Sequence, residues 1–293
     1  MKKLLILSGK GGTGKTSIAA AFSNFSKSKI VADCDVDAPN LHILNKQSSE
    51  PLRYDFVGSK KASIDPNKCI GCKKCYEHCH FDAIKYQDGK CEINEYACEG
   101  CGLCHYLCPV EAISMNDDFA GIIDVYSGES PFVTAKLKMG RGNSGKLVSA
   151  VKKLATKEYS DQELMIIDGS PGIGCPVIAS ISAVDMVLIV VEPSHSGLSD
   201  LKRLVKSVKL QKVKIAICVN KYDINEKISD EVITYANEEA LEFVGKVPYD
   251  KHVSKAINDG LSIADIDCQA KMAIYDIYLK VMDLIKDENL GGK

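Results

Sequence analysis

A glycine-rich stretch near the start of the chain constrains its fold more than any other feature. Residues 9–16 read Gly-Lys-Gly-Gly-Thr-Gly-Lys-Thr, which fits the pattern Gly-x-x-x-x-Gly-Lys-Thr of a phosphate-binding loop. An apolar run from Leu4 to Leu7 precedes the stretch, and a helical pattern from Lys15 to Lys27 follows it. Between a strand and a helix, glycines let consecutive backbone N–H groups point at phosphate oxygens. We therefore expect nucleotide phosphates to be bound by Gly9, Gly11, Gly12, Thr13, Gly14, Lys15, Thr16 and Ser17.

The side chains of this loop indicate ATP or ADP with magnesium as the ligand. Lys15 is expected to hold the β and γ phosphates, and the Thr16 hydroxyl to bind Mg²⁺. Such a site also needs a carboxylate at the end of a neighbouring buried strand. Asp168 follows the apolar run Leu164 to Ile167 and precedes a loop rich in glycine and proline, so it is our candidate. Turns without a ligand are the alternative explanation for both loops.

Short apolar runs alternate with longer helical patterns along most of the chain. This alternation predicts an α/β fold with a doubly wound, mostly parallel sheet covered by helices on both faces. The expected strands cover residues 4–7, 29–32, 164–167, 186–191, 214–219 and 243–247. The expected helices cover residues 15–27, 144–156, 198–210, 226–241 and 269–286. We assign residues 1–57 and 120–293 to this domain, because the alternation stops over residues 58–119.

Residues 58–119 are predicted to form a small inserted domain that is duplicated internally. Two runs of the pattern Cys-x-x-Cys-x-x-Cys-x-x-x-Cys begin at Cys69 and Cys98. The spacing resembles that of bacterial two-cluster ferredoxins, in which the fourth cysteine of each run binds the other run's cluster. We therefore expect an α+β ferredoxin-like domain with two [4Fe-4S] clusters. The expected ligands are Cys69, Cys72, Cys75 and Cys108 for one cluster, and Cys98, Cys101, Cys104 and Cys79 for the other.

Some features of the cysteine pattern leave alternatives open. Zinc is the rival metal, because paired Cys-x-x-Cys also makes tetrahedral zinc sites, although two duplicate four-cysteine runs favour clusters. His80 stands where the ferredoxin pattern has proline, and we expect it to alter local hydrogen bonding without binding the cluster. Five cysteines lie outside the runs: Cys34, Cys91, Cys175, Cys218 and Cys268. We expect them to be buried free thiols. A redox or metal role is the alternative for Cys34 and Cys175.

Three motifs, in chain order, resemble those of one ATPase superfamily. Lys10 makes the loop Lys-Gly-Gly-x-Gly-Lys-Thr, which is similar to the deviant Walker A motif of the MinD, ParA, Mrp and nitrogenase iron protein superfamily. Residues 33–41 resemble its switch I, and residues 168–174 resemble its switch II. The resemblance covers the chain outside the insert. Within the superfamily, the chain looks like the MinD-type ATPases that contain an inserted ferredoxin domain.

The resemblance implies roles for individual residues. Lys10 corresponds to the signature lysine that reaches the partner's phosphates across an ATP-bound dimer, which implies a homodimer or a heterodimer with a related ATPase. Asp35 corresponds to the carboxylate that positions the attacking water, with Asp33 and Asp37 as weaker candidates. The catalytic set is thus Lys10, Lys15, Asp35 and Asp168. Further nucleotide contacts are implied for Pro171, Gly172, Pro193, Asn220 and Pro248, with Asn220 contacting adenine.

Charge and hydropathy argue against several classes of partner. The 37 basic and 39 acidic side chains give a net charge of −2, which offers no electrostatic basis for binding nucleic acid. The first apolar run is too short for a signal peptide or a membrane span, so we expect a cytoplasmic protein. The pattern over residues 269–286 is that of an amphipathic core helix, because it lacks the basic face of a membrane-binding helix. We therefore expect no membrane anchor.

These observations favour an Mg²⁺-dependent ATPase that carries iron-sulfur clusters. We expect ATP-driven dimer closure to be coupled to electron transfer, or to metal-cluster assembly, on a redox or metal-cluster partner protein. The alternative is a nucleotide-dependent regulatory or positioning switch of the MinD or ParA type, with clusters that sense redox state or stabilise the structure. A ferredoxin with an inactive ATPase scaffold agrees poorly with the intact set of Lys10, Lys15, Thr16, Asp35 and Asp168.

Overall fold

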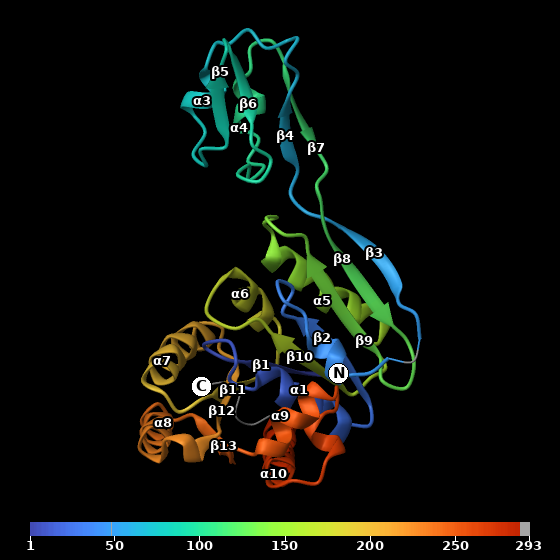
Figure 1. Cartoon of the computed structure of the whole chain (residues 1–293), viewed down its shortest axis with the longest axis vertical. Coiled ribbons are helices and arrows are strands. Elements are labelled where there is room, and N and C mark those ends of the chain that lie inside the picture. Colours follow the sequence, from blue (N-terminus) through green and yellow to red (C-terminus); the bar gives the residue numbers. More distant parts are fainter. Residues whose placement is uncertain (48, 288–293) are drawn as a thin grey trace. The chain divides into compact units, whose positions relative to one another are not determined.

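A computed structural model describes residues 1–47 and 49–287 of the chain. The chain divides into two compact units, whose elements are labelled in Figure 1. The larger unit comprises residues 1–53, residues 123–136 and the chain from residue 144 onward. The smaller unit comprises residues 54–122 and 137–143, so it contains the whole of the expected insert.

A nine-stranded sheet has the strand order β13-β12-β11-β1-β10-β2-β9-β8-β3. Its neighbours from β13 to β9 are parallel, with Leu5 of β1 opposite Ile167 of β10. The strands are β1 (Lys2–Leu7), β2 (Lys29–Cys34), β3 (Leu52–Val57), β8 (Phe119–Tyr126), β9 (Phe132–Leu137), β10 (Leu164–Gly169), β11 (Met186–Val191), β12 (Lys214–Asn220) and β13 (Glu242–Val247). Every residue of β2, β10 and β11 is buried, as in a parallel sheet covered on both faces. The expected α/β fold with a mostly parallel sheet is confirmed.

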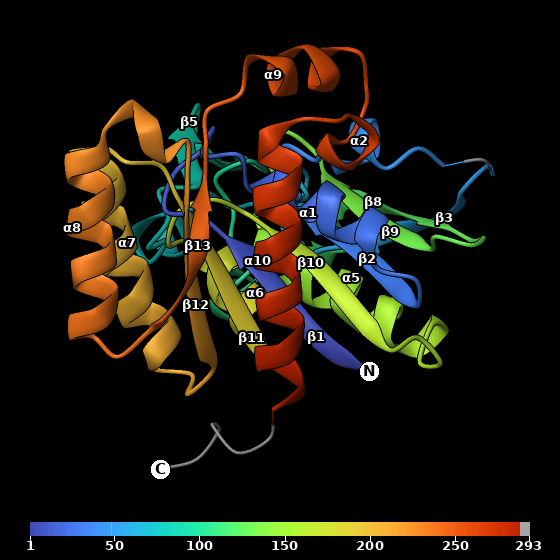
Figure 2. The ribbon, with the colours of Figure 1, turned by 90° about the horizontal axis from the view of Figure 1, so that it is seen from below.

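Helices cover this sheet on two sides, with α1 and α10 on one face and α5 and α6 on the other (Figures 1 and 2). Phe22 of α1 meets Tyr278 of α10 edge to face, with ring centroids 5.2 Å apart, and so joins the first and last helices. The helices of the larger unit are α1 (Lys15–Phe25), α2 (Leu41–Leu44), α5 (Ser144–Glu158), α6 (Cys175–Ile181), α7 (His195–Lys209), α8 (Glu226–Glu238), α9 (Lys251–Asn258) and α10 (Gln269–Lys286). Two short 3₁₀ turns complete it, η1 (Tyr222–Ile224) and η2 (Ile263–Asp265).

All six expected strands and all five expected helices are present, and they differ from expectation mainly at their ends. Helix α7 begins at His195 rather than Leu198, because the Ser194 hydroxyl accepts a hydrogen bond from the Gly197 N–H at 3.1 Å and caps the helix. Strands β3, β8 and β9, which lie next to the insert in the sequence, were not expected. They extend the sheet beyond β2, and β3 forms that edge.

Helix α10 contributes to the core, as its pattern predicts. Ile274, Ile277 and Val281 are buried against the sheet. Met272 was expected on the same apolar face, but it is 67% exposed. Met272 lies three residues before exposed Tyr275 and so shares its side of the helix, not the buried side that carries Ile274. Within the described residues, no helix is long and apolar enough to span a membrane.

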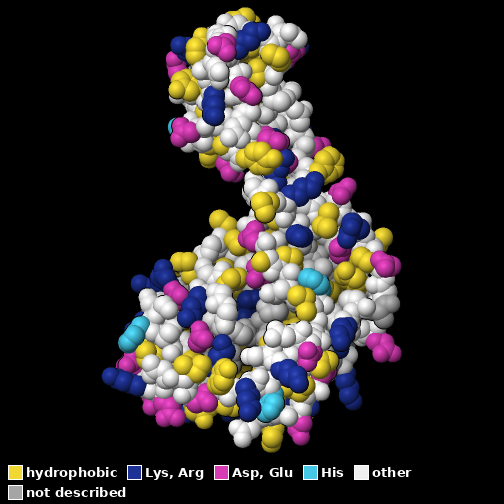
Figure 3. Space-filling view, in the orientation of Figure 1, with side chains coloured by type: hydrophobic (Ala, Val, Ile, Leu, Met, Phe, Trp, Pro, Cys, Tyr) yellow, Lys and Arg dark blue, Asp and Glu magenta, His cyan; other side chains and the backbone are white. Residues whose placement is uncertain are grey.

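Charged side chains of both signs are mixed on the face drawn in Figure 3. Lysine and arginine side chains lie among aspartate and glutamate side chains over the elements of the larger unit. On this face, neither sign of charge gathers into a region of its own.

The smaller unit consists of two structurally similar halves. Equivalent residues of the two halves are 29 positions apart in the sequence, as Lys61 and Lys90 are. Strand β4 pairs with β7, and β5 pairs with β6, both antiparallel. Each of β4, β5 and α3 has its counterpart 29 residues later in β6, β7 and α4, respectively. Their bounds are β4 (Lys61–Ile64), α3 (Lys74–Glu77), β5 (Ile84–Gln87), β6 (Lys90–Ile93), α4 (Leu103–Leu107) and β7 (Ile113–Asn116). The internal duplication seen in the cysteine runs thus extends to the fold.

Residues 137–143 join the smaller unit although they follow β9 in the sequence. Arg141 is held there by ion pairs with Glu95 at 2.9 Å and Asp118 at 3.5 Å, and its guanidinium lies over the Tyr96 ring. Asn143 accepts a hydrogen bond from the Ser59 hydroxyl at 2.6 Å. The sequence offered no local signal for these contacts.

Lys152 of α5 is buried beneath the C-terminal end of α6. Its Nζ donates hydrogen bonds to the backbone oxygens of Ala179 at 3.2 Å, Ser180 at 2.7 Å, and Ser182. The last carbonyls of a helix have no partner within the helix, so Lys152 caps α6. Burial lowers the pKa of Lys152 to about 8. This residue therefore links α5 to the helix that follows Asp168.

Replacing Lys152 with methionine is expected to change how stability depends on pH. Because the pKa of Lys152 is about 8 in the folded chain and 10.5 in its ordinary state, the folded state binds this proton less tightly. The native free energy of unfolding should fall as the pH drops from 10.5 to 8, by at most about 1.4 kcal/mol per pH unit. The variant lacks this slope, so the native-minus-variant difference, measured by urea unfolding, should grow with pH in this window. A constant difference would show that Lys152 titrates normally.

Candidate functional site

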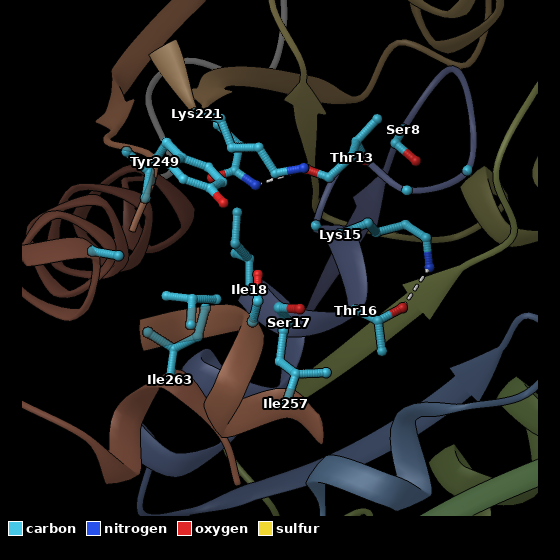
Figure 4. A pocket seen from close by; sticks show the side chains of 18 of the residues that line it. Ser8, Thr13, Lys15, Thr16, Ser17, Ile18, Lys221, Tyr249, Ile257 and Ile263 are labelled. Carbon is cyan, nitrogen blue, oxygen red and sulfur yellow. Dashed lines mark hydrogen bonds between the residues drawn. The ribbon is translucent and has the colours of Figure 1, made fainter. Parts of the chain in front are cut away.

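The glycine-rich loop between β1 and α1 takes a shape that only glycine adopts easily. Gly12 and Gly14 have φ angles of 80° and 90°, in the left-handed region that side chains disfavour. A Cβ atom on Gly14 would lie 2.2 Å from Nδ2 of Asn220. Asn220, the last residue of β12, donates a hydrogen bond from this nitrogen to the backbone oxygen of Thr13 at 2.7 Å (Figure 4). The end of β12 therefore holds the loop in place.

A cavity of 460 Å³ lies against this loop, within the usual size range of ligand sites. Figure 4 shows Lys15 and Thr16 at one part of it and Tyr249 and Ile263 at another. One wall offers backbone N–H groups, hydroxyls and an ammonium group. The other wall is mostly apolar, and its residues come from β13, the loop after it, α9, η2 and α10: Val247, Pro248, Val253, Ile257, Ile263 and Ala270. A ligand with a phosphate end and a planar base matches both walls.

The ammonium group of Lys15 pairs with the carboxylate of Asp168 at the inner end of the loop. Lys15 Nζ lies 2.5 Å from Asp168 Oδ1, and the two side chains are 6% and 0% exposed. The pairing arises because β1 and β10 are neighbours in the sheet and both end at this edge. Lys15 Nζ also lies 3.4 Å from the Thr16 hydroxyl (Figure 4). Among the described residues, Asp168 Oδ2 is buried without a hydrogen-bond partner, so one oxygen remains available to a ligand.

Two further carboxylates lie close to Asp168. Asp33 is opposite Asp168 in the register of β2 and β10, and burial together with the Asp168 charge raises the pKa of Asp33 to about 8. Burial raises the pKa of Asp35 to about 6, against the effect of Lys15. Neighbouring carboxylates disfavour one another's ionised form unless a nearby positive charge compensates them. The free oxygen of Asp168, the Thr16 hydroxyl and these carboxylates are the oxygen ligands that Mg²⁺ prefers, so the residues fit this ion.

Lys10 contacts the segment between β11 and α7. Its Nζ lies 3.1 Å from Glu192 Oε2 and 3.0 Å from the Ser194 hydroxyl. Glu192 also pairs with Lys221 at 3.2 Å. Although burial opposes it, hydrogen bonds from the two lysines keep the pKa of Glu192 below its ordinary value. Within a single chain, Lys10 is therefore bound to Glu192 and Ser194.

The cavity is lined by most residues expected to bind nucleotide. These are Gly11, Gly12, Thr13, Gly14, Lys15, Thr16, Ser17, Asp35, Pro171, Asn220 and Pro248. The expected residues that are not part of the lining are Gly9, Lys10, Asp168, Gly172 and Pro193. Gly9 instead allows close packing on α7, where a Cβ atom would lie 2.3 Å from Cβ of Asp200. The N–H of Gly172 donates to the backbone oxygen of Ser8 at 2.9 Å, which ties the loop after Asp168 to the glycine-rich loop.

Several residues of this site were not expected from the sequence. Lys221 and Tyr249 line the cavity, and Glu192 and Ser194 hold Lys10. Lys221 and Tyr249 directly follow the expected residues Asn220 and Pro248, so their positions beside those residues could have indicated them. The contacts of Lys10 had no such signal, because they cross more than 180 residues of sequence.

The smaller unit has two small cavities, each lined by four cysteines from the two runs. The first cysteine cavity is lined by Cys69, Cys72, Cys75 and Cys108. The second cysteine cavity is lined by Cys98, Cys101, Cys104 and Cys79. The structure thus gathers the cysteines in the two expected sets, with the fourth cysteine of each run in the other run's cavity.

The surroundings of the two cysteine cavities include a hydrogen bond to sulfur and a further thiol. Cys108 Sγ accepts a hydrogen bond from the Ala112 N–H at 3.2 Å. Over residues 1–47 and 49–287, no three His, Cys, Asp or Glu side chains are placed to hold one metal ion. Cys91 is a fifth thiol in the first cysteine cavity, which the spacing of the runs did not predict. The side chain of His80 is exposed.

The other cysteines outside the runs differ in accessibility. Cys34 and Cys218 are completely buried, and burial raises the pKa of both thiols, to about 12 for Cys218. Such thiols are protonated and inert at neutral pH. Cys268 is partly buried, and Cys175, at the start of α6, is exposed.

The strand, loop and helix order, the sheet and the glycine-rich loop coincide with one known family. Residues 4–263 match the family described as the CobQ/CobB/MinD/ParA nucleotide binding domain. The chain belongs to this family. The fold agrees, because the MinD cell division protein of Aquifex aeolicus superposes with a TM-score of 0.56 over 97% of both chains, at 17% identity. A MinD structure from Pyrococcus horikoshii with a similar TM-score of 0.56 is a complex with Mg-ADP.

Relatives by sequence are found over almost the whole chain. The uncharacterized protein MJ0578 of Methanocaldococcus jannaschii is 36% identical over 97% of this chain and 97% of its own length. An iron-sulfur cluster carrier protein of Pyrococcus horikoshii is 24% identical over 99% of this chain and 89% of its own length. The relatives by sequence therefore include a protein named an iron-sulfur cluster carrier, at low identity.

Proposed function

We propose that the chain is an Mg²⁺-dependent ATPase that carries two [4Fe-4S] clusters and couples its nucleotide state to a partner protein. The coupled process is electron transfer to that partner or assembly of a metal cluster on it. One observation carries the proposal: a single chain contains a cavity at the glycine-rich loop, beside the Lys15 and Asp168 pair, and two further cavities that each gather four cysteines of the two runs. The two sites make different chemical demands, and this chain meets both.

The residues of the larger unit supply the hydrolysis. Lys15 neutralises phosphate charge at the inner end of the loop, while Thr16 and Asp168 hold Mg²⁺, which stabilises the charge that develops during phosphoryl transfer. Asp35, whose pKa is about 6, lines the cavity and orients the attacking water. Lys10 exchanges Glu192 and Ser194 for the phosphates of a partner subunit, in a homodimer or a heterodimer with a related ATPase. This exchange provides a positive charge only when two chains close on ATP.

The duplicated cysteine runs favour clusters over zinc. Both runs have the ferredoxin spacing, and each cavity gathers the four cysteines expected for one cluster. The N–H···S contact to Cys108 is typical of the hydrogen bonds that tune such clusters.

The proposed coupling draws on the order of the two sites in the chain. The cysteine runs lie between Asp35 and Asp168 in the sequence, so the chain enters and leaves the smaller unit between two segments that are expected to contact the phosphates. Relatives named iron-sulfur cluster carrier proteins support a role in which clusters serve a second protein. The partner of this chain is accordingly a redox protein or a recipient of a metal cluster.

The midpoint potentials of the clusters test the coupling directly. Protein purified without oxygen would be titrated with MgADP and then with a non-hydrolysable MgATP analogue. We expect a shift of about 60 mV per electron, which is a tenfold change in the reduction equilibrium and about 1.4 kcal/mol of coupling. The matched control is Lys15→Ala, in which the two nucleotides should give equal potentials.

Two other outcomes would change the proposal. Unchanged potentials in the native protein would rule out direct redox coupling and favour cluster delivery or a MinD-like regulatory switch, the fold being shared with MinD proteins. Transfer of iron and sulfide to an apo acceptor protein in a nucleotide-dependent way would then support delivery. Protein that binds no iron after anaerobic reconstitution would refute the cluster assignment.

A further inference from the structure

The two cysteine cavities occupy equivalent places in the duplicated fold. Residues that line the second cavity recur 29 positions later in the first, as Ala83 and Ala112 or Ile84 and Ile113 show. The duplication therefore provides an internal control. Any residue pair that differs between the cavities makes the two sites chemically unequal, while the backbone around them is the same.

Three pairs in the binding loops differ in charge. Each residue of a pair lines its own cavity, 29 positions from its counterpart. At these positions the first cavity is lined by two lysines and no acidic residue. The second cavity is lined by one glutamate and no lysine. The pairs are Ile70 and Glu99, Lys73 and Gly102, and Lys74 and Leu103.

The backbone at Lys73 is strained. Lys73 has a φ of 62°, in the left-handed region, whereas its counterpart Gly102 has a φ of 78° that glycine adopts freely. A side chain in this conformation costs about 1–2 kcal/mol. The lysine Nζ lies 4.2 Å from the centre of the Tyr86 ring, which fixes it beside the loop. Glycine would relieve the strain but lose the contact with Tyr86, so the lysine is kept at a conformational cost.

A fourth difference is the thiol of Cys91, where the second cavity has Ala62. Cys91 is 6% exposed and hydrogen-bonds through its side chain to Cys75. Its backbone N–H donates to Cys69. Hydrogen bonds to cluster sulfurs and nearby positive charge both favour the reduced state, because a cluster gains one negative charge on reduction.

We propose that the cluster of the first cysteine cavity has the higher midpoint potential, and that Lys73 and Lys74 are positioning residues that set this difference. This inference rests on the proposed function. With one electron supplied by a redox partner protein, the first cluster would be the one reduced, the second would stay oxidised, and no bond or proton would change. Lys73 and Lys74, which line the first cavity, are both exposed.

The test gives positions 73 and 74 of the first loop the residues of the second loop, with the double substitution Lys73→Gly and Lys74→Leu, and leaves Ile70 unchanged. Dithionite titration followed by electron paramagnetic resonance would measure both potentials in the reconstituted full chain. We expect the higher potential to fall so that the reduction equilibrium of that cluster changes about tenfold, which is 59 mV for one electron. The lower potential should stay within a threefold change in equilibrium. Lys85→Gln is the control, because Lys85 is exposed in the same unit and lines neither cavity.

A separate variant identifies the cluster. With Cys72→Ala, which removes a ligand from the first cavity, the remaining cluster should titrate at the lower potential. Iron analysis comes first: about eight iron atoms per native chain are required by two four-iron clusters. With this iron bound, equal potentials in the native chain, or equal shifts in the double variant and Lys85→Gln, would overturn the inference and leave the proposed function intact. Absence of iron would instead refute the proposed function.

The free energy of unfolding separates tuning from structural support. Since glycine relieves the strain at position 73, the double variant should unfold at the same urea concentration as the native chain or at a higher one. A merely structural role for the two lysines would lower this concentration and leave the potentials unchanged.

Discussion

Lys15→Ala is expected to lower the rate of ATP hydrolysis at least a hundredfold, the usual effect of removing one preorganised charge from a transition state. Lys15 Nζ is the positive group beside the phosphate loop, 2.5 Å from Asp168. Without it, the phosphates lose their neutralising charge. Release of phosphate from MgATP would be measured for the variant and for Lys27→Ala, a control that removes an exposed lysine just beyond α1.

Loss of activity in Lys15→Ala has a second possible origin in the fold, which a double variant separates. The substitution leaves the buried carboxylate of Asp168 unpaired, and breaking a buried ion pair costs about 3–5 kcal/mol. Lys15→Ala combined with Asp168→Asn removes that charge and should restore most of the unfolding free energy but none of the activity. Normal ATP turnover in either variant would show that the active site is elsewhere.

The double variant Cys79→Ala and Cys101→Ala is expected to lose one cluster and keep the other, halving the iron per chain. These cysteines belong to different runs but line the same second cysteine cavity. Ligation by run would remove a ligand from both clusters. The matched variant Cys72→Ala and Cys79→Ala takes both cysteines from one run but one from each cavity, so it should lose both clusters.

Iron content and the spectrum of the retained cluster distinguish the two schemes. The spectrum of the first double variant should match that of Cys101→Ala alone, because both retain the first cavity. Cys268→Ala serves as the control, since Cys268 lies in the larger unit and is expected to keep all iron. If the Cys79 and Cys101 variant binds no cluster while the Cys72 and Cys79 variant retains one, the exchange of fourth cysteines between runs is wrong.

Much of the fold could be predicted because its signals are local. The runs that became β1, β10 and β11 are apolar throughout, as strands buried on both faces must be, and each is followed or preceded by a helical pattern. The loop from Gly9 to Thr16 carries its own chemistry within eight residues. The cysteine spacing acts in the same way, since three thiols on one loop already share a cavity.

What could not be predicted depends on contacts between distant parts of the chain. Residues 137–143 join the smaller unit through distant contacts, among them the ion pairs of Arg141 with Glu95 and Asp118. Lys10 was expected to reach a partner, but its contacts to Glu192 and Ser194 depend on the segment that follows β11 lying beside the glycine-rich loop. The position of Met272 depended on which stripe of α10 met the sheet. No pattern of neighbouring residues encodes such contacts.

The sequence by itself determined the chemistry available to this protein: a phosphate loop, acidic residues at strand ends and two sets of thiols. The tertiary structure decided which of these groups meet. Strand order brought Lys15 to Asp168 across 153 residues, and the pairing of β4 with β7 and β5 with β6 brought Cys79 and Cys108 into each other's cavities. The physical reason is that periodicity and turn chemistry act over a few residues, whereas the position of one strand beside another is set by the packing of the whole core.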